Sequence, residues 1–163
     1  MTNRFFPSLK KCKTCKLMLI NGPLQERSIE SGKFIVIVKN IQTKICSKGC
    51  NGIYWPHLDF GCEVFDLLDN KSEDIAGKTL GFFKIKQICK KCKVTLSDKE
   101  TKDTFEFTKG GTNKLKLIIT APSLVCEKCN KHYLPVQTST WDSYYVELGD
   151  VISKALTTNF IYK

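Results

Sequence analysis

The stretch Cys12-Lys13-Thr14-Cys15 is followed thirty residues later by Cys46-Ser47-Lys48-Gly49-Cys50, and the same arrangement recurs as Cys89-Lys90-Lys91-Cys92 and Cys126-Glu127-Lys128-Cys129. Two cysteines so close together in a tight turn direct both sulfurs at one point, and two such turns supply the four thiolates of a closed tetrahedral zinc site. One pair alone is also typical of a redox site, but four pairs in two matching sets favour metal. The sequence therefore predicts two zinc ions per chain. The ligands would be Cys12, Cys15, Cys46 and Cys50 for one ion, and Cys89, Cys92, Cys126 and Cys129 for the other.

The two sets resemble each other beyond their cysteines. Asn, Tyr and Pro follow the last cysteine at the same offsets in both, as Asn51, Tyr54 and Pro56 and again as Asn130, Tyr133 and Pro135. A shared pattern of this kind predicts an internal duplication. Cys62 has no counterpart, since Trp141 stands at the matching place. We interpret Cys62 as a small buried apolar residue, and the alternatives of a further metal ligand or a reactive thiol stay open.

Apolar runs and turn residues predict mainly antiparallel strands. The first set would hold strands at 17–20, 34–38 and 41–45, with Asn21-Gly22-Pro23 opening a polar loop over 21–33. The second would hold strands at 82–85, 105–107 and 115–120, with a hairpin turn at 109–113. Helices are expected over 63–69 and over 143–156. The second would be capped by Asp142 and would carry one apolar stripe, formed by Tyr145, Leu148, Ile152 and Leu156. The predicted fold class is a small β-rich, zinc-stabilised protein: tandem four-cysteine zinc ribbons with a short helix after each ribbon.

The length of 163 residues suits two small modules. We expect a first ribbon module over 1–70, a linker over 71–81, and a second ribbon module with a C-terminal helix over 82–163. Neither half has the apolar sequence for a large core, and structural zinc supplies folding free energy at this size.

Lysines gather around the first cysteine pair of each set. The formal net charge is +10 and the pI about 9.2, which is typical of nucleic-acid-binding domains. Acidic residues concentrate instead between Asp59 and Asp74. A lysine-rich solvated surface without a partner is the alternative. The predicted nucleic-acid contacts are Lys10, Lys11, Lys13, Lys16, Lys86, Lys90, Lys91 and Lys93, with Tyr54, Trp55 and Tyr133 stacking on bases.

The order of one cysteine pair, about thirty residues with a strong strand, and a second cysteine pair followed by the aromatic residues Tyr54 and Trp55 resembles the YgiT-type zinc finger of bacterial antitoxins. The stretch Cys50-Asn51-Gly52-Ile53-Tyr54-Trp55-Pro56-His57 is also similar to the ribbon that closes PIN-like ribonuclease domains of the mutator type, where a Tyr-Trp pair follows the last cysteines. The resemblance covers residues 12–57 well and 89–135 more loosely, and it does not reach the effector part of either family. It implies a rigid platform that contacts nucleic acid or holds a protein partner.

No set of residues predicts catalysis. A shell of four thiolates leaves zinc no open position for water, and we expect His57 and His132 to be surface residues. The sequence favours a non-enzymatic nucleic-acid-binding accessory factor of a larger nucleic-acid machine. A docking or assembly subunit without nucleic-acid contact is the alternative. Neither function requires a membrane or a small-molecule substrate. The cysteine pairs and the absence of a secretion signal lead us to expect an intracellular protein, in cytoplasm or nucleus.

Overall fold

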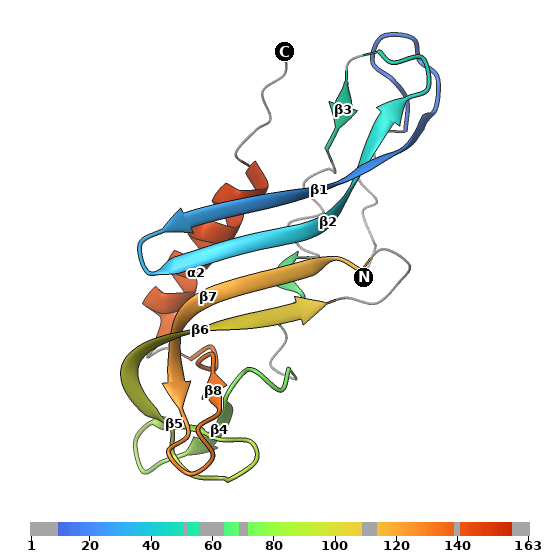
Figure 1. Ribbon diagram of the computed structural model, residues 1–163. Coiled ribbons are helices and arrows are strands. Elements are labelled where there is room, and N and C mark those ends of the chain that lie inside the picture. The colour runs from blue at the N-terminus through green and yellow to red at the C-terminus, as the bar shows by residue number, and fades with distance from the viewer. Residues whose placement is uncertain are drawn as a thin grey trace, which may run out of the picture.

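The computed structural model describes residues 10–50, 52–55, 64–68, 72–108, 114–138 and 141–157. Four long antiparallel strands form one sheet in the order β1-β2-β7-β6, and helix α2 lies against it (Figure 1). The short strands β3 and β8 pair with the ends of β2 and β7, and β4 with β5 forms a separate two-stranded sheet. The elements are β1 (Leu19–Ser31), β2 (Phe34–Cys46), β3 (Ile53–Tyr54), β4 (Gly77–Leu80), β5 (Ile85–Ile88), β6 (Ser97–Thr108), β7 (Lys116–Val125), β8 (His132–Tyr133) and α2 (Asp142–Thr157).

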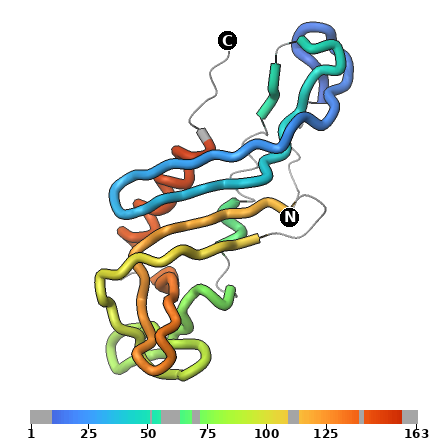
Figure 2. Tube along the Cα trace, in the orientation of Figure 1, coloured from blue at the N-terminus to red at the C-terminus, as the bar shows by residue number. Residues whose placement is uncertain are grey.

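The sheet consists of two long hairpins that meet along β2 and β7. The contact runs antiparallel from the pair Ile35↔Thr120 to the pair Lys39↔Lys116. Each hairpin then continues beyond the shared sheet in the opposite direction (Figure 2). The β1–β2 hairpin ends in a first lobe, which we define as residues 10–24, 42–50 and 52–55. The β6–β7 hairpin ends in a second lobe, residues 72–100 and 122–138.

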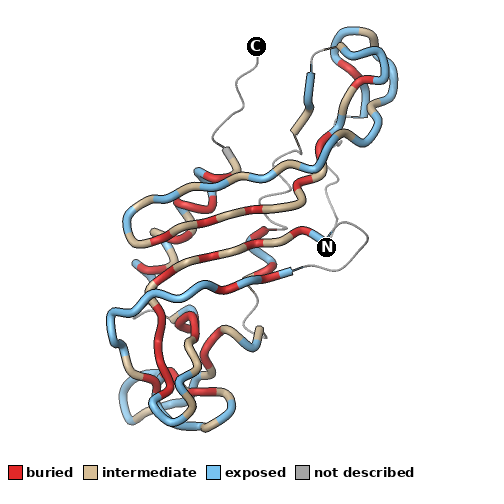
Figure 3. Tube along the Cα trace, in the orientation of Figure 1, coloured by how far each residue is buried: buried red, intermediate tan, exposed pale blue. Residues whose placement is uncertain are grey.

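The main core lies between one face of the sheet and α2. Along β2, buried residues alternate with half-exposed ones from Phe34 to Val38, as expected for a strand with one covered face (Figure 3). The Phe34 ring meets the Tyr144 ring edge-on, with 5.0 Å between centroids. Leu148 and Ile152 of α2 are fully buried in the same cluster. The prediction of a C-terminal helix with one apolar stripe is therefore confirmed.

Strand β1 corrects the prediction of a polar loop over 21–33. Gly22 and Pro23 do not end the strand, because the pairing of β1 with β2 shifts register between Asn21 and Leu24. Pro23 is tolerated because it falls within this shift on an edge strand, where it has no Cα partner in the pairing with β2. Gly22 is required by close packing, since a Cβ there would lie 2.8 Å from the side chains of Thr43 and Ile45.

The expectation of a short helix after each ribbon is also corrected. Within the described parts of the chain, α2 is the one helix with defined bounds. The first predicted helix, 63–69, is described only over 64–68, where Val64 and Phe65 are helical and a turn follows. Val64 and Leu67 nevertheless reach the main core. The expected hairpin turn at 109–113 lies outside the described residues.

The region expected to be a linker, 71–81, carries structure of its own. It contains β4, and Ile75 forms a parallel bridge with Leu134. The predicted strand over 82–85 is wrong for residues 82–84, which form the turn between β4 and β5, whereas Ile85 begins β5. The turn is closed by a 2.8 Å hydrogen bond from the Gly81 N–H to the Lys84 carbonyl.

Leu148→Ala tests the main core. The side chain is fully buried between α2 and the sheet, so its truncation is expected to lower the free energy of unfolding by about 2–5 kcal/mol. Val146→Ala on the exposed side of the same helix serves as the matched control, with an expected change within about 0.5 kcal/mol. Urea unfolding followed by circular dichroism measures both, and equal destabilisation by the two changes would contradict this placement of the core.

Candidate metal centres

The structure brings the eight predicted ligands together as two groups of four. In each group the Sγ atoms all lie within 4.8 Å of one another. Two of these separations are 3.3 Å, between Cys15 and Cys46, and 3.8 Å, between Cys89 and Cys129. Four sulfurs about 2.3 Å from a tetrahedral zinc ion stand about 3.8 Å apart. Both groups can therefore hold a metal ion with little rearrangement.

Each group lies at the open end of a long hairpin. Cys12 and Cys15 precede β1, and Cys46 is the last residue of β2, with Cys50 just beyond. In the second lobe one cysteine pair precedes β6 and the other follows β7. The hairpin thus carries cysteines that are far apart in sequence to the same point. Strands β3 and β8 then close the lobes by pairing at Lys44↔Tyr54 and Leu124↔Tyr133.

Three of the four cysteine pairs share one turn geometry. The N–H of the residue after the second cysteine donates to the carbonyl of the first cysteine, at 3.0 Å for Lys16, 2.9 Å for Lys93 and 2.7 Å for Asn130. These three residues have φ values of 61°, 58° and 58°. Asparagine tolerates this left-handed conformation, whereas for lysine it costs about 1–2 kcal/mol. The fourth pair, which has one extra residue, uses Gly49 with φ 74°.

A tyrosine hydroxyl contacts the first sulfur of each group. The Tyr54 hydroxyl donates to Cys12 Sγ at 3.5 Å, and that of Tyr133 lies 3.2 Å from Cys89 Sγ. Burial raises the pKa of Tyr133, so its hydroxyl remains a proton donor. The expected stacking role of Tyr133 is wrong, because its side chain is 1% exposed. Tyr54 is half-buried, and its hydroxyl also accepts a 3.2 Å hydrogen bond from the Lys13 N–H.

The thiols differ in how readily they ionise. The hydrogen bond from Tyr54 is the main cause that lowers the pKa of Cys12 to about 6. Burial raises the pKa of Cys89, but hydrogen bonds, that of Tyr133 first, outweigh it and bring the value to about 6. The pKa of Cys50 rises to about 12 through its contact with Cys15 and through desolvation. The pKa of Cys92 also rises to about 12, mainly through burial and next through its contact with Cys129. Four thiolates at this spacing therefore require a cation.

The cysteines of both groups are free thiols in the described parts of the chain. Their sulfur separations greatly exceed the bond length of about 2.05 Å in a disulfide. Cys62, for which three roles stayed open, lies outside the described residues.

The first lobe is strongly basic. No acidic residue occurs in the residues that define it, and all its lysines are exposed. Lys16 Nζ donates to the Lys13 carbonyl at 2.9 Å, and Lys44 Nζ to Asn21 Oδ1 at 2.5 Å. Trp55 is half-buried, and the Arg27 guanidinium lies 4.0 Å from its ring centroid. The six lysines are Lys10, Lys11, Lys13, Lys16, Lys44 and Lys48.

The second lobe is more balanced in charge. Lys86, Lys91 and Lys93 are exposed, whereas Lys90 is half-buried and donates to the Ser72 carbonyl. Elsewhere in this lobe acids compensate lysines, with Lys99 3.2 Å from Glu127 and Lys131 3.6 Å from Asp74. The predicted nucleic-acid contacts are thus divided between the two lobes, and the two lysine clusters do not adjoin.

His132 is half-buried and has partners that the sequence did not reveal. Its Nδ1 lies 2.8 Å from Ser123 Oγ and 3.9 Å from Asp103 Oδ2. In a catalytic triad the serine and the carboxylate contact opposite ring nitrogens. Here both face the same nitrogen, so the cluster does not have the geometry of a triad.

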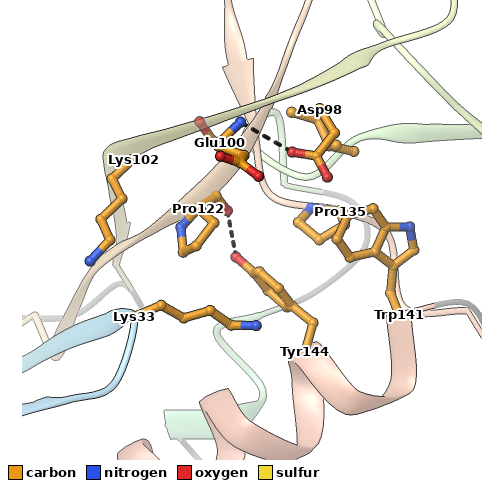
Figure 4. A pocket seen from close by; sticks show the side chains of 10 residues that line it. Lys33, Asp98, Glu100, Lys102, Pro122, Pro135, Trp141 and Tyr144 are labelled. Carbon is orange, nitrogen blue, oxygen red and sulfur yellow. Dashed lines mark hydrogen bonds between the residues drawn. The ribbon is translucent and has the colours of Figure 1, made fainter.

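A cleft of about 330 Å³ lies beside the first turn of α2 (Figure 4). Trp141 and Tyr144 form one wall, and their rings meet at 84°. The Tyr144 hydroxyl is engaged, since it donates to the Pro122 carbonyl at 2.8 Å. The lining also includes Lys33, Lys102, Asp98 and Glu100 (Figure 4), and the Lys33 ammonium lies 3.2 Å from Glu147 Oε2. The lining mixes both charge signs and includes Ser123, whose hydroxyl lies 2.8 Å from His132 Nδ1.

Cys89→Ser is expected to remove one metal ion and leave the other. Cys89 and Cys126 belong to the small buried cluster of the second lobe, so this lobe should become sensitive to proteolysis while α2 and the main core persist. Native mass spectrometry would count the ions and limited proteolysis would locate the loosened segment. Cys62→Ser is the matched control, predicted from the sequence to keep both ions. Retention of two ions by Cys89→Ser would contradict the ligand assignment.

Tyr54→Phe and Tyr133→Phe test the contacts between hydroxyl and sulfur. Without the hydrogen bond to a ligand, metal affinity at that site is expected to weaken by roughly 10–100-fold. Competition with a coloured chelator measures the affinity. Tyr144→Phe removes a hydrogen bond to a carbonyl and not to a sulfur, so this variant should keep both affinities.

None of the helices in the described residues is long and apolar enough to cross a membrane. Compared with protein-family models, curated proteins and solved structures, the chain matches none. The resemblance to YgiT-type and PIN-associated ribbons accordingly stays a hypothesis.

Proposed function

We propose that the protein binds nucleic acid through its basic lobes, with a structural zinc ion supporting each lobe. The observation that carries the proposal is the first lobe, where six exposed lysines surround one cysteine group without a single acidic residue. Such a surface attracts a polyanion and releases its counterions on binding. The ribbon resemblance implies a rigid platform of the same kind.

Zinc is the metal that the donor set favours. Four soft thiolates in a closed tetrahedral arrangement are typical of structural zinc. A reducing compartment, cytoplasm or nucleus, would keep the cysteines available as ligands. The residues of each lobe would then be held by the ion, because the first lobe in particular has few buried apolar side chains besides Cys12 and Cys46.

The lysines exceed what the metal site itself needs. Four thiolates and one Zn²⁺ carry a net charge of about −2, which nearby lysines offset. Six lysines leave the first lobe clearly positive even after this compensation. Lys11 and Lys13 flank Cys12 at the turn of the first cysteine pair, and Lys10 directly precedes them.

The separation of the lobes constrains the ligand. From Cys46 along β2 to Val38, and from its partner Leu117 along β7 to Cys126, the path is at most about 55 Å at about 3.3 Å per residue. A duplex needs about 16 base pairs to cover this distance. A ligand of that length would engage both lobes and gain affinity through effective concentration.

A docking or assembly function is the second candidate, and exposed apolar side chains favour it. Met18 is 57% exposed and Ile20 49%, and Leu17, Leu24 and Ile53 are also exposed in the first lobe. A patch of this kind often marks a protein interface. Phosphate binding weakens steeply with salt, whereas apolar docking does not, so the two candidates differ in a measurable property.

The combined change Lys10→Gln, Lys11→Gln and Lys13→Gln is expected to weaken binding to a nucleic acid of about 24 units by more than roughly tenfold. The slope of log K against log salt concentration, here called the salt slope, should fall in magnitude by about one for each phosphate that the variant no longer neutralises. Replacement of Lys86, Lys90 and Lys91 by Gln should weaken binding to this ligand by a similar factor. The loss of affinity should be smaller for a nucleic acid of about eight units, which reaches a single lobe. Fluorescence anisotropy with RNA, single-stranded DNA and duplex DNA at two salt concentrations gives both quantities.

A control that removes the same amount of charge uses lysines already paired with acids. Lys39, Lys99 and Lys116 lie within 3.2 Å of Glu26, Glu127 and Glu106, so their replacement by Gln should affect binding little. If both lysine-to-glutamine test variants keep their metal and bind nucleic acid with unchanged affinity, the nucleic-acid proposal is contradicted and the docking function is favoured.

A further inference from the structure

The turn between β4 and β5 presents two phenylalanine rings to solvent. Phe82 is 97% exposed and Phe83 96%, and they occupy the centre of the turn that Gly81 and Lys84 close. Their ring centroids are 5.6 Å apart, and the rings pack edge to face. Leu80 at the end of β4 is 88% exposed. Apolar side chains this open are costly in water, so the exposure points to a partner.

The surroundings of this turn are positively charged. No acidic residue occurs between Ile75 and Ser97, a stretch that carries six lysines. Lys84 closes the turn and Lys86 is the second residue of β5, so both exposed lysines lie close in sequence to the two rings. The six lysines are Lys78, Lys84, Lys86, Lys90, Lys91 and Lys93.

The hairpin that bears the rings is firmly fixed at its base. Gln87 of β5 is buried and exchanges two hydrogen bonds with Val136, accepting from its N–H at 2.7 Å and donating to its carbonyl at 3.3 Å. Ala76, just before β4, donates to the Leu134 carbonyl at 2.9 Å. The aromatic pair is thus held out from the second lobe on a supported element, which reduces the entropy cost of binding.

We infer that this turn is a stacking platform for the bases of a single-stranded nucleic acid, with Lys84 and Lys86 contacting the flanking phosphates. The inference rests on the proposed function and specifies its ligand class. Bases in a single strand have free faces that can stack on an aromatic ring, whereas those in a duplex are already stacked on each other. The turn would therefore make the second lobe selective for unpaired strands, while the first lobe contributes its six exposed lysines.

The test compares Phe82→Ala/Phe83→Ala, Phe82→Leu/Phe83→Leu and Phe82→Trp/Phe83→Trp with the unchanged protein. Anisotropy uses a single strand and a duplex of about 24 units, long enough to reach both lobes. Removal of the stacking surface for two bases should weaken single-strand binding by roughly 30-fold or more in the Ala variant, and almost as much in the Leu variant. Binding to the duplex and the salt slope should stay the same, because the charge is unchanged. The Trp variant should bind single strands at least as tightly as the unchanged protein.

Leu17→Ala/Met18→Ala removes an exposed apolar pair from the other lobe and should leave the single-strand affinity unchanged. Native mass spectrometry checks that every variant keeps its metal. If the Ala variant binds single strands normally while the lysine variants do not, the platform is wrong and the proposed function stands. If the Leu variant binds as well as the unchanged protein, apolar docking replaces stacking. Phosphatidylserine vesicles that bind the unchanged protein but not the Ala variant, with single-strand affinity unaffected, would assign the turn to membranes instead.

Discussion

The antiparallel pairing of β2 with β7 is the contact on which the rest of the structure depends. It joins two hairpins that are far apart in sequence, and it creates one continuous apolar face for α2 to cover. Neither hairpin alone has a face wide enough to bury Phe34, Leu117 and Ile119 together with the helix. Because the pairing is antiparallel, it also sends the two cysteine groups to opposite ends of the molecule. The main core and the separation of the lobes thus have one cause.

The sheet positions the two four-cysteine groups, each of which could hold a metal ion. The hairpins bring distant cysteine pairs together, but the close thiols resist full ionisation, as the raised pKa values of Cys50 and Cys92 indicate. A bound cation would remove that conflict and fix each lobe. The second lobe adds a small apolar cluster around Tyr133, whereas the first relies more heavily on its ligands. Removal of metal should therefore loosen the first lobe more completely.

The sequence predicted best those features that depend on residues close together in the chain. Cysteine spacing identified both metal groups, and the stripe from Tyr145 to Leu156 identified α2. Strand β1 was missed because Gly22 and Pro23 normally end a strand, and only the neighbouring β2 explains how a register shift accommodates them. Phe82 and Phe83 favour a strand by composition, yet the partner strand β4 makes them a turn. The recurrence of Tyr54 and Tyr133 was visible, but their contact with the sulfurs depends on the pairing of β3 with β2 and of β8 with β7, which the sequence does not reveal.

The two outer strands of the sheet are protected against further strand pairing. β1 carries two register shifts, and β6 carries one between Asp98 and Thr101, where Glu100 has φ 53°. Exposed charged residues continue along β6 through Lys102, Asp103 and Glu106. Irregular, charged edges of this kind discourage a second chain from extending the sheet. The outer strands are therefore poor templates for strand pairing between copies of the chain.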